Sequence, residues 1–284
     1  MKIENRYDFV MIFDVENGNP NGDPDAGNAP RVDAETGYGY ITDVCLKRKI
    51  RNYVELCKEG EAGYNILVKP DKALNTKFTE AYEAEGLPIK NKGKNTDDVK
   101  KAKEYMCRNY YDVRTFGAVM STGDDPCGIV RGPVQINFAR SVSPVNIQDV
   151  TITRQARTTE DRTKTGETEM GRKSVIPYAL YRAEGYVSAA LGNKVGLTED
   201  DIEVLWEAII NMFEHDHSAA RGKMCMRKLY VFKHDSVLGN CPSHILFDKI
   251  VVEETNIIPS RTFSDYKISV DNELPKGVLL IEKL

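Results

Sequence analysis

An apolar run of nine residues near the N-terminus most constrains the fold of this chain. The run reads YDFVMIFDV from Tyr7 to Val15, and only Asp8 and Asp14 interrupt it. Aromatic and branched side chains without regular polar alternation are typical of a strand that is buried on both faces. We therefore expect a central strand here, in a sheet that other elements cover on both sides.

The chain changes character directly after this strand. Residues 16–30 read ENGNPNGDPDAGNAP, which is almost entirely Gly, Pro, Asn and Asp. These residue types favour turns and interrupt helices and strands. We expect a long ordered loop without a helix or strand of its own, and loops of this length inside a domain are usually functional or mobile.

The remaining periodicities alternate between helical and extended. Apolar residues at helical spacing predict helices at 42–58, 97–110, 178–191 and 198–214. Alternating or branched runs predict strands at 132–140, 227–233, 245–252 and 278–282. Residues 59–95 are polar and irregular and are interpreted as an insertion. This order predicts an α+β fold, of the ferredoxin-like or RNA-recognition type, with insertions.

Composition limits the classes of function. Asp and Glu number 43 against 39 Lys and Arg, for a net charge of −4, which excludes a uniformly basic nucleic-acid sleeve but not a local basic groove. A hydrophobic content of 41% is enough for a core. No apolar stretch is long enough to span a membrane and the N-terminus is polar, so we expect neither a membrane segment nor a signal peptide. The six cysteines form no CxxC pair, which indicates reduced thiols in the cytoplasm and no paired-cysteine zinc site.

A basic surface is expected on the helix predicted at 42–58. It carries five cations and two acids, and the cations are Lys47, Arg48, Lys49, Arg51 and Lys58. Cations near the start of a helix are opposed by the macrodipole, so their clustering favours an anionic partner such as a phosphate backbone. The preceding loop can bring Arg31 alongside them. The alternative is an ordinary solvated helix face.

A protruding arm is predicted at 150–175. Between 151 and 174 there are seven threonines, six Lys or Arg and four acids, and two β-biased runs flank a Lys-Thr-Gly turn at 164–166. A hairpin of this composition has little core and indicates contact with something outside the fold. Its candidate contacts are Arg154, Arg157, Arg162, Met170, Arg172 and Lys173. Met170 can wedge against an unstacked base, and the alternative for it is a local packing contact.

Two groups of acids and histidines could instead support an enzyme. Glu214-His215-Asp216-His217 resembles a metal site or a nuclease acid–base pair, but it also lies where a helix is predicted to end, and there the dipole stabilises cationic His. The loop acids Glu16, Asp23, Asp25 and Asp33 fit the spacing of neither an EF-hand loop nor a dinucleotide fingerprint. The chain has four histidines and none of the common P-loop, HExxH or GxSxG motifs.

Four segments together carry a family resemblance. They read RYDFVMIFDVENGNPNGDPDAGNAPRVD, ITDVCLKRKIRNYV, YDVRTFGAVMS and GPVQINFARSVSPV, and the likeness spans residues 6–58 and 111 to about 226. They closely resemble the type I-C backbone subunit of Cascade, the Csd-type member of the CRISPR RAMP superfamily.

This resemblance implies a fold and a set of contacts. The fold would be one elaborated domain over 1–284, a modified RNA-recognition palm with a helical finger-like insertion at about 59–110 and a β-hairpin thumb at 146–176. In the family's pattern the basic helix with Lys47, Arg48, Lys49 and Arg51 lies on the RNA backbone, and Arg31 lies on the preceding loop.

The resemblance also implies partners and the absence of catalysis. Several copies would polymerise along the spacer of a CRISPR RNA and present it for pairing with target DNA, beside large, small and guide-processing Cascade subunits. No cofactor, metal, membrane or catalytic residue would be involved. Related type III subunits cleave RNA with a loop Asp, so Asp23, Asp25 and Asp33 keep a metal-dependent ribonuclease open as the alternative, together with His215, Asp216 and His217.

Overall fold

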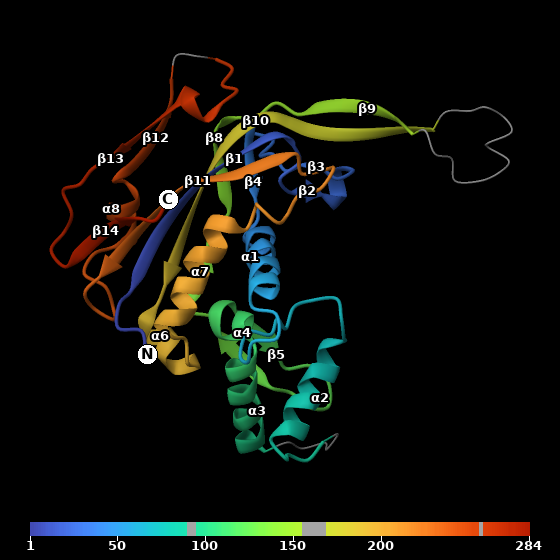
Figure 1. The fold of residues 1–284 in the computed structure, drawn as a ribbon, viewed down its shortest axis with the longest axis vertical. Helices are drawn as coiled ribbons and strands as arrows, with labels where there is room; N and C mark the ends of the chain where they lie inside the picture. The colour runs from blue at the N-terminus through green and yellow to red at the C-terminus, as the bar shows by residue number, and fades with distance from the viewer. Residues whose placement is uncertain (90–94, 155–168, 256–257) are drawn as a thin grey trace, which may run out of the picture.

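A central antiparallel sheet organises the protein. The computed structural model describes residues 1–89, 95–154, 169–255 and 258–284, without the side chains of residues 154 and 169. The sheet has the order β14-β11-β1-β10-β8-β4, and β7 and β9 also pair with β10 (Figure 1). Its strands are β1 (Tyr7–Gly18), β4 (Tyr38–Ile41), β7 (Val134–Ile136), β8 (Ala139–Pro144), β9 (Gln148–Arg154), β10 (Glu169–Val187), β11 (Lys223–His234) and β14 (Val278–Glu282).

The predicted central strand is confirmed. β1 lies between β10 and β11, in register from Tyr7 opposite Val187 to Gly18 opposite Ile176. Alternate residues of β1 enter two different cores because side chains of a strand point to opposite faces. Phe9, Met11 and Phe13 pack beneath helices, whereas Val10 and Ile12 pack against the C-terminal elements.

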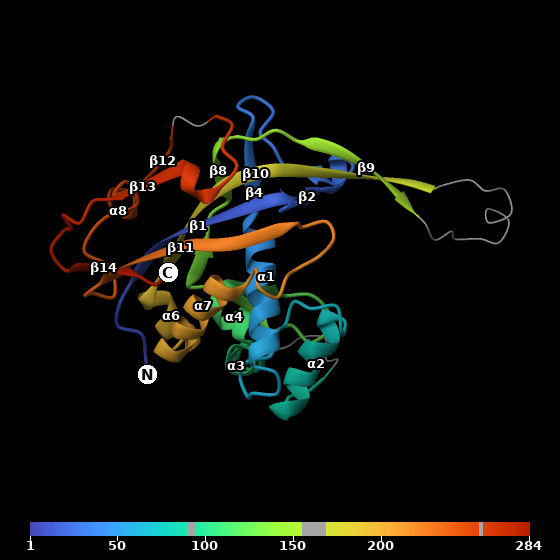
Figure 2. The same cartoon turned by 45° about the horizontal axis from the view of Figure 1, so that its top comes forward.

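Two helices cover the first face of the sheet. These are α1 (Asp43–Cys57) and α7 (Glu199–Asn211), and both lie on the same side of β1 and β11 in Figures 1 and 2. Trp206 of α7 packs edge-on against Tyr7 and Phe9. The shorter α6 (Ala189–Val195) lies beside them and leads into α7.

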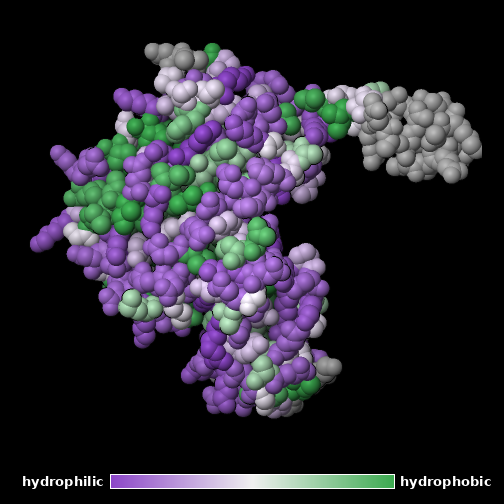
Figure 3. Space-filling view, in the orientation of Figure 1, coloured by the Kyte–Doolittle hydropathy of each residue, from purple (hydrophilic) through white to green (hydrophobic). Residues whose placement is uncertain are grey.

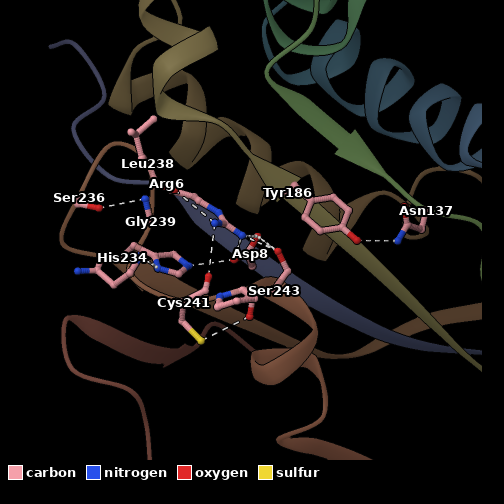
Figure 4. A network of polar contacts seen from close by, with 12 residues as sticks. Arg6, Asp8, Asn137, Tyr186, His234, Ser236, Leu238, Gly239, Cys241 and Ser243 are labelled. Atoms are coloured by element: carbon pink, nitrogen blue, oxygen red, sulfur yellow. Dashed lines mark hydrogen bonds and ion pairs between the residues drawn. The ribbon is translucent and has the colours of Figure 1, made fainter.

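The C-terminal elements cover part of the opposite face. They are α8 (Ser243–Phe247) and the hairpin of β12 (Ile250–Glu254) and β13 (Tyr266–Val270), with the 3-10 turn η2 (Phe263–Asp265) before β13. Asp8 of β1 is fully buried on this face. Its carboxylate accepts hydrogen bonds from Arg6, His234 and Ser243, as Figure 4 shows. This polar network ties β1 and β11 to the start of α8.

A finger with its own small core projects from the helical face. It contains α2 (Leu74–Ala84), α3 (Thr96–Asn109), α4 (Tyr111–Phe116), β5 (Gly117–Met120) and β6 (Gly128–Arg131). Phe78, Tyr82 and Met106 pack there with Cys127 and Val130. The finger core therefore continues past the insertion expected at 59–110, up to β6.

The arm is a direct continuation of the sheet. β10 is 19 residues long: its second part pairs with β1, and its first part, from Glu169 to Val175, pairs with β9. Figures 1 and 2 show this ribbon leaving the body on one side. Because one strand belongs to both sheet and arm, the arm has a fixed direction at its base.

Three local predictions were wrong. Residues 178–191 were expected to be a helix, but they form the end of β10 and the start of α6. Residues 245–252 were expected to be a strand, but α8 precedes β12 there. The loop at 16–30 has short elements of its own, namely β2 (Gly22–Asp23), the 3-10 turn η1 (Pro24–Ala26) and β3 (Ala29–Pro30). The overall α+β class is confirmed.

Candidate nucleic-acid interface

The elements that carry the predicted site residues border the surface between arm and finger. Figure 3 shows the molecule hollowed between these two projections, and α1 lies along that side in Figure 1. We call this surface the hollow. It is bounded by the arm strands, by α1 and the loop before it, and by the finger.

The start of α1 is held against the Asn/Gly/Pro loop. The Thr42 hydroxyl caps the helix by accepting from the amide of Cys45 at 3.3 Å. The Asn21 side chain in turn accepts from the backbone amide of Thr42 at 3.0 Å and from its hydroxyl. The loop therefore does not move independently of α1, and residues that it carries have a defined position beside the helix.

Arg31 lies on this loop. Its guanidinium is 3.4 Å from the Asp23 carboxylate, and its side chain is about a fifth exposed. The Arg31 Nε is buried and has no hydrogen-bond partner among the residues that the structure describes. A guanidinium with a donor still unused and a partly exposed edge is suited to an anion.

Lys49 differs from the other α1 cations because it points inward. Its side chain is 2% exposed and forms an ion pair with Asp216, which also pairs with Arg221 at 2.6 Å. The ammonium of Lys49 also lies 5.8 Å from the centre of the Phe213 ring. Lys49 therefore joins α1 to the segment after α7 and does not offer its charge to the hollow.

Lys47 and Arg51 each pair with an acid of the protein but remain partly exposed. Lys47 bonds Asp43 at 2.9 Å and Gln135 at 3.2 Å. Arg51 pairs with the buried Asp112 at 2.8 Å, and its guanidinium stacks 5.0 Å from the Phe116 ring. Both side chains keep some exposure, but each already has an acidic partner in the protein.

Arg48 is the α1 cation with the most freedom. It forms no ion pair with any residue in the described ranges, and it lines a shallow pocket between α1 and the segment that enters the finger. Lys69 and Lys72 line the same pocket, although Lys69 pairs with Glu55 of α1 and Lys72 pairs with Glu80 of α2. Sequence reasoning did not select these two lysines, because they lie in the segment interpreted as an irregular insertion.

The arm presents apolar groups on both of its faces. Met170 is 76% exposed and shares one face with Arg172, which lies 3.9 Å from Asp149. Val150 and Ile152 are exposed on the other face, on which Lys173 donates to the Ala219 carbonyl at 2.6 Å. Alternation along the strands therefore predicts two different contact surfaces on the arm. The backbone of Arg154 pairs with Glu169, and Arg157 and Arg162 lie outside the described residues.

The enzyme-like cluster does not form a metal site in the structure. α7 ends at Asn211, so the cluster lies in the turns beyond the helix. Asp216 is paired with Lys49 and Arg221, while the His215 ring packs 6.0 Å from Tyr53. No group of three metal-ligating side chains is found within the described parts of the chain.

Two of the loop acids, Asp23 and Asp33, likewise have partners within the loop. Asp23 faces Arg31 and accepts from the amide of Asp25, and the carboxylate of Asp33 accepts from the amide of Glu35 at 3.1 Å. That hydrogen bond to the backbone lowers the pKa of Asp33. Such contacts stabilise turns.

Comparison with known proteins supports a family assignment. The family model for CRISPR-associated protein Cas7 matches residues 5–271. The chain belongs to this family. A curated relative, CRISPR-associated protein Cas7 of Haloferax volcanii, is 27% identical over an alignment of 228 residues, which covers 73% of this chain and 65% of that protein. The chain thus spans slightly less than two thirds of that relative's length.

Similar solved structures come from RNA-guided complexes. A chain of a CRISPR RNA-guided surveillance complex in a pre-nicking state has a TM-score of 0.49 and 13% identity, with 80% of this chain and 78% of that chain covered. A chain of the Type III-B Cmr-beta complex with cognate target RNA has a TM-score of 0.43 and 13% identity, with 80% and 61% covered. Among the described residues, no helix has the length and apolar character to cross a membrane.

Proposed function

We propose that this protein is a non-catalytic backbone subunit of a type I-C CRISPR surveillance complex. Several copies bind along the spacer of a guide RNA and present it for pairing with target DNA, in contact with the large, small and guide-processing subunits. The complex works in the cytoplasm. Membership of the Cas7 family is the observation that carries this proposal, and the hollow gives it a location on the molecule.

The arrangement of cations around the hollow supports RNA binding without sequence readout. Arg31 lies on the pre-helix loop, Lys47 and Arg51 are partly exposed on α1, and Arg48 lines the pocket beside the segment that enters the finger. Phosphate contacts of this kind position a nucleic acid, whereas base edges carry sequence information. Each contact releases counterions from the RNA, which makes the affinity depend on salt.

The arm supports the assembly of several copies. None of the arm residues 148–153 and 170–175 is buried, although Val150, Ile152 and Met170 are apolar. A hairpin that buries nothing in its own chain gains order from a neighbour. We assign one face to the RNA, with Met170 and Arg172, and the other to the next copy.

The salt dependence of RNA binding tests the proposal. We expect Arg48→Gln to weaken binding to unrelated single-stranded RNAs equally and to reduce the log–log salt slope by about 0.7, the value for one phosphate contact. Arg140→Gln is the matched control, since Arg140 lies on β8 on the face of the sheet opposite α1, in line with Val142. An unchanged slope for Arg48→Gln, or a loss that depends on RNA sequence, would contradict the proposed contact.

A metal-dependent ribonuclease is the less favoured function. Its main acid, Asp216, is engaged by two cations, and neutralising contacts of that kind oppose binding of a cation at the same oxygens.

A further inference from the structure

A second basic surface lies away from the hollow, where the finger meets α6. Side chains of α3, β6 and α6 line an open groove there. In Figures 1 and 2, α6 lies on the opposite side of α1 from the direction in which the arm extends. We call this surface the α3–α6 groove, and nothing in the proposed guide-RNA contacts uses it.

The walls of the α3–α6 groove are strongly cationic. They carry five basic residues and one acid: Lys100, Lys103, Arg108, Arg131, Lys194 and Glu104. Arg108 pairs with Glu85 of α2. The other four cations have no ion pair within the described residues, in contrast to the cations of α1. Unpaired like charges on facing walls repel one another, so the free protein gains stability when an anionic group enters.

The floor of the groove is aliphatic. Ile129 is 62% exposed there, and Val130, Leu191 and Val195 lie beside it. The exposed Val119 lies directly opposite Ile129 in the β5–β6 ladder and extends the apolar surface beyond the groove. Exposed, contiguous apolar side chains rimmed by charge are typical of a protein contact.

We propose that the α3–α6 groove binds an acidic amphipathic segment of a partner protein. Carboxylates of the segment pair with the wall cations, and its aliphatic side chains cover Ile129. The composition favours a protein segment over a nucleic acid, because no aromatic side chain lines the groove and single strands are bound largely by stacking on aromatic rings. Glu104 would also oppose a continuous phosphate backbone.

Binding of model peptides to the full-length protein tests this proposal. The probe is a fluorescein-labelled amphipathic helix with glutamates on one face and leucines on the other. The same peptide with lysines in place of glutamates, and oligo-dT, serve as comparison ligands. Fluorescence anisotropy should show that the acidic peptide binds more tightly than either comparison ligand.

Paired variants locate the site. Lys103→Glu with Lys194→Glu, and separately Ile129→Ser, should each weaken acidic-peptide binding by about tenfold or more, which corresponds to about 1.4 kcal/mol. The matched controls are Lys101→Glu with Lys276→Glu, both exposed outside the groove, and Val251→Ser, at an exposed position of β12. These controls should change binding by less than about twofold. Guide-RNA binding should stay at the wild-type level in all variants, which separates this test from that of the proposed function.

Three results would overturn the proposal. Tighter binding of oligo-dT that is lost in the Lys103→Glu, Lys194→Glu variant would make the groove a nucleic-acid site. Absence of acidic-peptide binding, or equal binding by all variants, would remove the groove as a docking site. A change in the protein's own oligomeric state on charge reversal, without an effect on the peptide, would assign the groove to a second copy.

Discussion

Lys49 of α1 and Asp216, which follows α7, form a nearly buried ion pair across 167 positions of the sequence. Arg221 contacts the same carboxylate and so closes a small network at the base of the arm. The pair fixes α1 against the loop that supports Lys173 through the Ala219 carbonyl. The position of α1, which carries the candidate RNA contacts, therefore depends on a lysine that points into the protein.

Removing the acid of this pair should destabilise the protein. Asp216→Asn leaves the ammonium of Lys49 buried without a counter-charge, and we expect a loss of about 3–5 kcal/mol in the free energy of unfolding. Lys49→Met should cost less, since Asp216 keeps Arg221. Urea unfolding measures both changes. Glu214→Gln, an exposed neighbour, is the control, and a loss for Asp216→Asn as small as that of this control would show that the pair is not desolvated.

The stability of the finger should decrease at acid pH because of Asp71. Burial acts to raise the pKa of Asp71, but the Lys77 ammonium and the Lys72 amide outweigh it and lower the pKa to about 2. Lys77 is itself buried and also donates to the Leu67 carbonyl at 2.9 Å. A carboxylate whose folded-state pKa is lowered stabilises the fold above its ordinary pKa near 4, and this contribution is lost as the pH falls toward 2.

The corresponding experiment compares Asp71→Asn with the wild type across pH. The variant should be less stable by about 1–2 kcal/mol at neutral pH, since Lys77 loses a charged hydrogen-bond partner that is itself partly exposed. The difference should stay constant down to about pH 5 and narrow below pH 4. A stability difference between variant and wild type that grows as the pH falls would contradict a lowered pKa for Asp71.

The histidine cluster should be dispensable for RNA chemistry. His215→Ala with His217→Ala should leave guide-RNA binding unchanged, because the ion pair between the cluster and α1 is made by Asp216 with Lys49, whereas His215 contributes a ring contact with Tyr53. Labelled RNA incubated with the wild type and Mg²⁺ or Mn²⁺ should remain intact on a denaturing gel. Cleavage that requires the metal and disappears in the double variant would establish the nuclease alternative.

Sequence patterns predicted the elements that have either a clear helical period or a run of branched and aromatic residues. β1, α1, α7 and β14 are found close to their expected positions. The strand β10 was mistaken for a helix because both of its faces are covered between Tyr178 and Ala183, so that no polar alternation marks it. Leu180, Ala183 and Val187 then matched helical spacing by coincidence. Gly185 fits the strand, since a side chain there would collide with the Phe9 ring.

The candidate site was predictable in part. The elements that carry the selected basic residues, α1 and the arm, border the same hollow, but sequence alone did not separate Lys49 from Arg48. A signal was present, because Lys49 lies three residues after Leu46 and next to Ile50, within the buried stripe of the helix. Arg221 gave no local signal, since its position beside Asp216 depends on the tertiary fold.

The arm should be separable from the fold. Replacing residues 151–172 by a short Gly-Ser turn removes no described side chain that is buried, so the melting temperature should change by no more than about 2 °C. Retained circular dichroism would confirm a folded palm and finger. Marked destabilisation would show that the arm is part of the core.

The most direct test of the account is a count of copies on one guide RNA by native mass spectrometry. The wild type should form a ladder of complexes that ends in several copies per RNA, because we propose that the arm of each copy contacts both the RNA and the next copy. The arm-shortened protein should bind as single copies without the ladder. A wild type that saturates at one copy per RNA, or an arm-shortened variant that gives the wild-type ladder, would contradict the central claim.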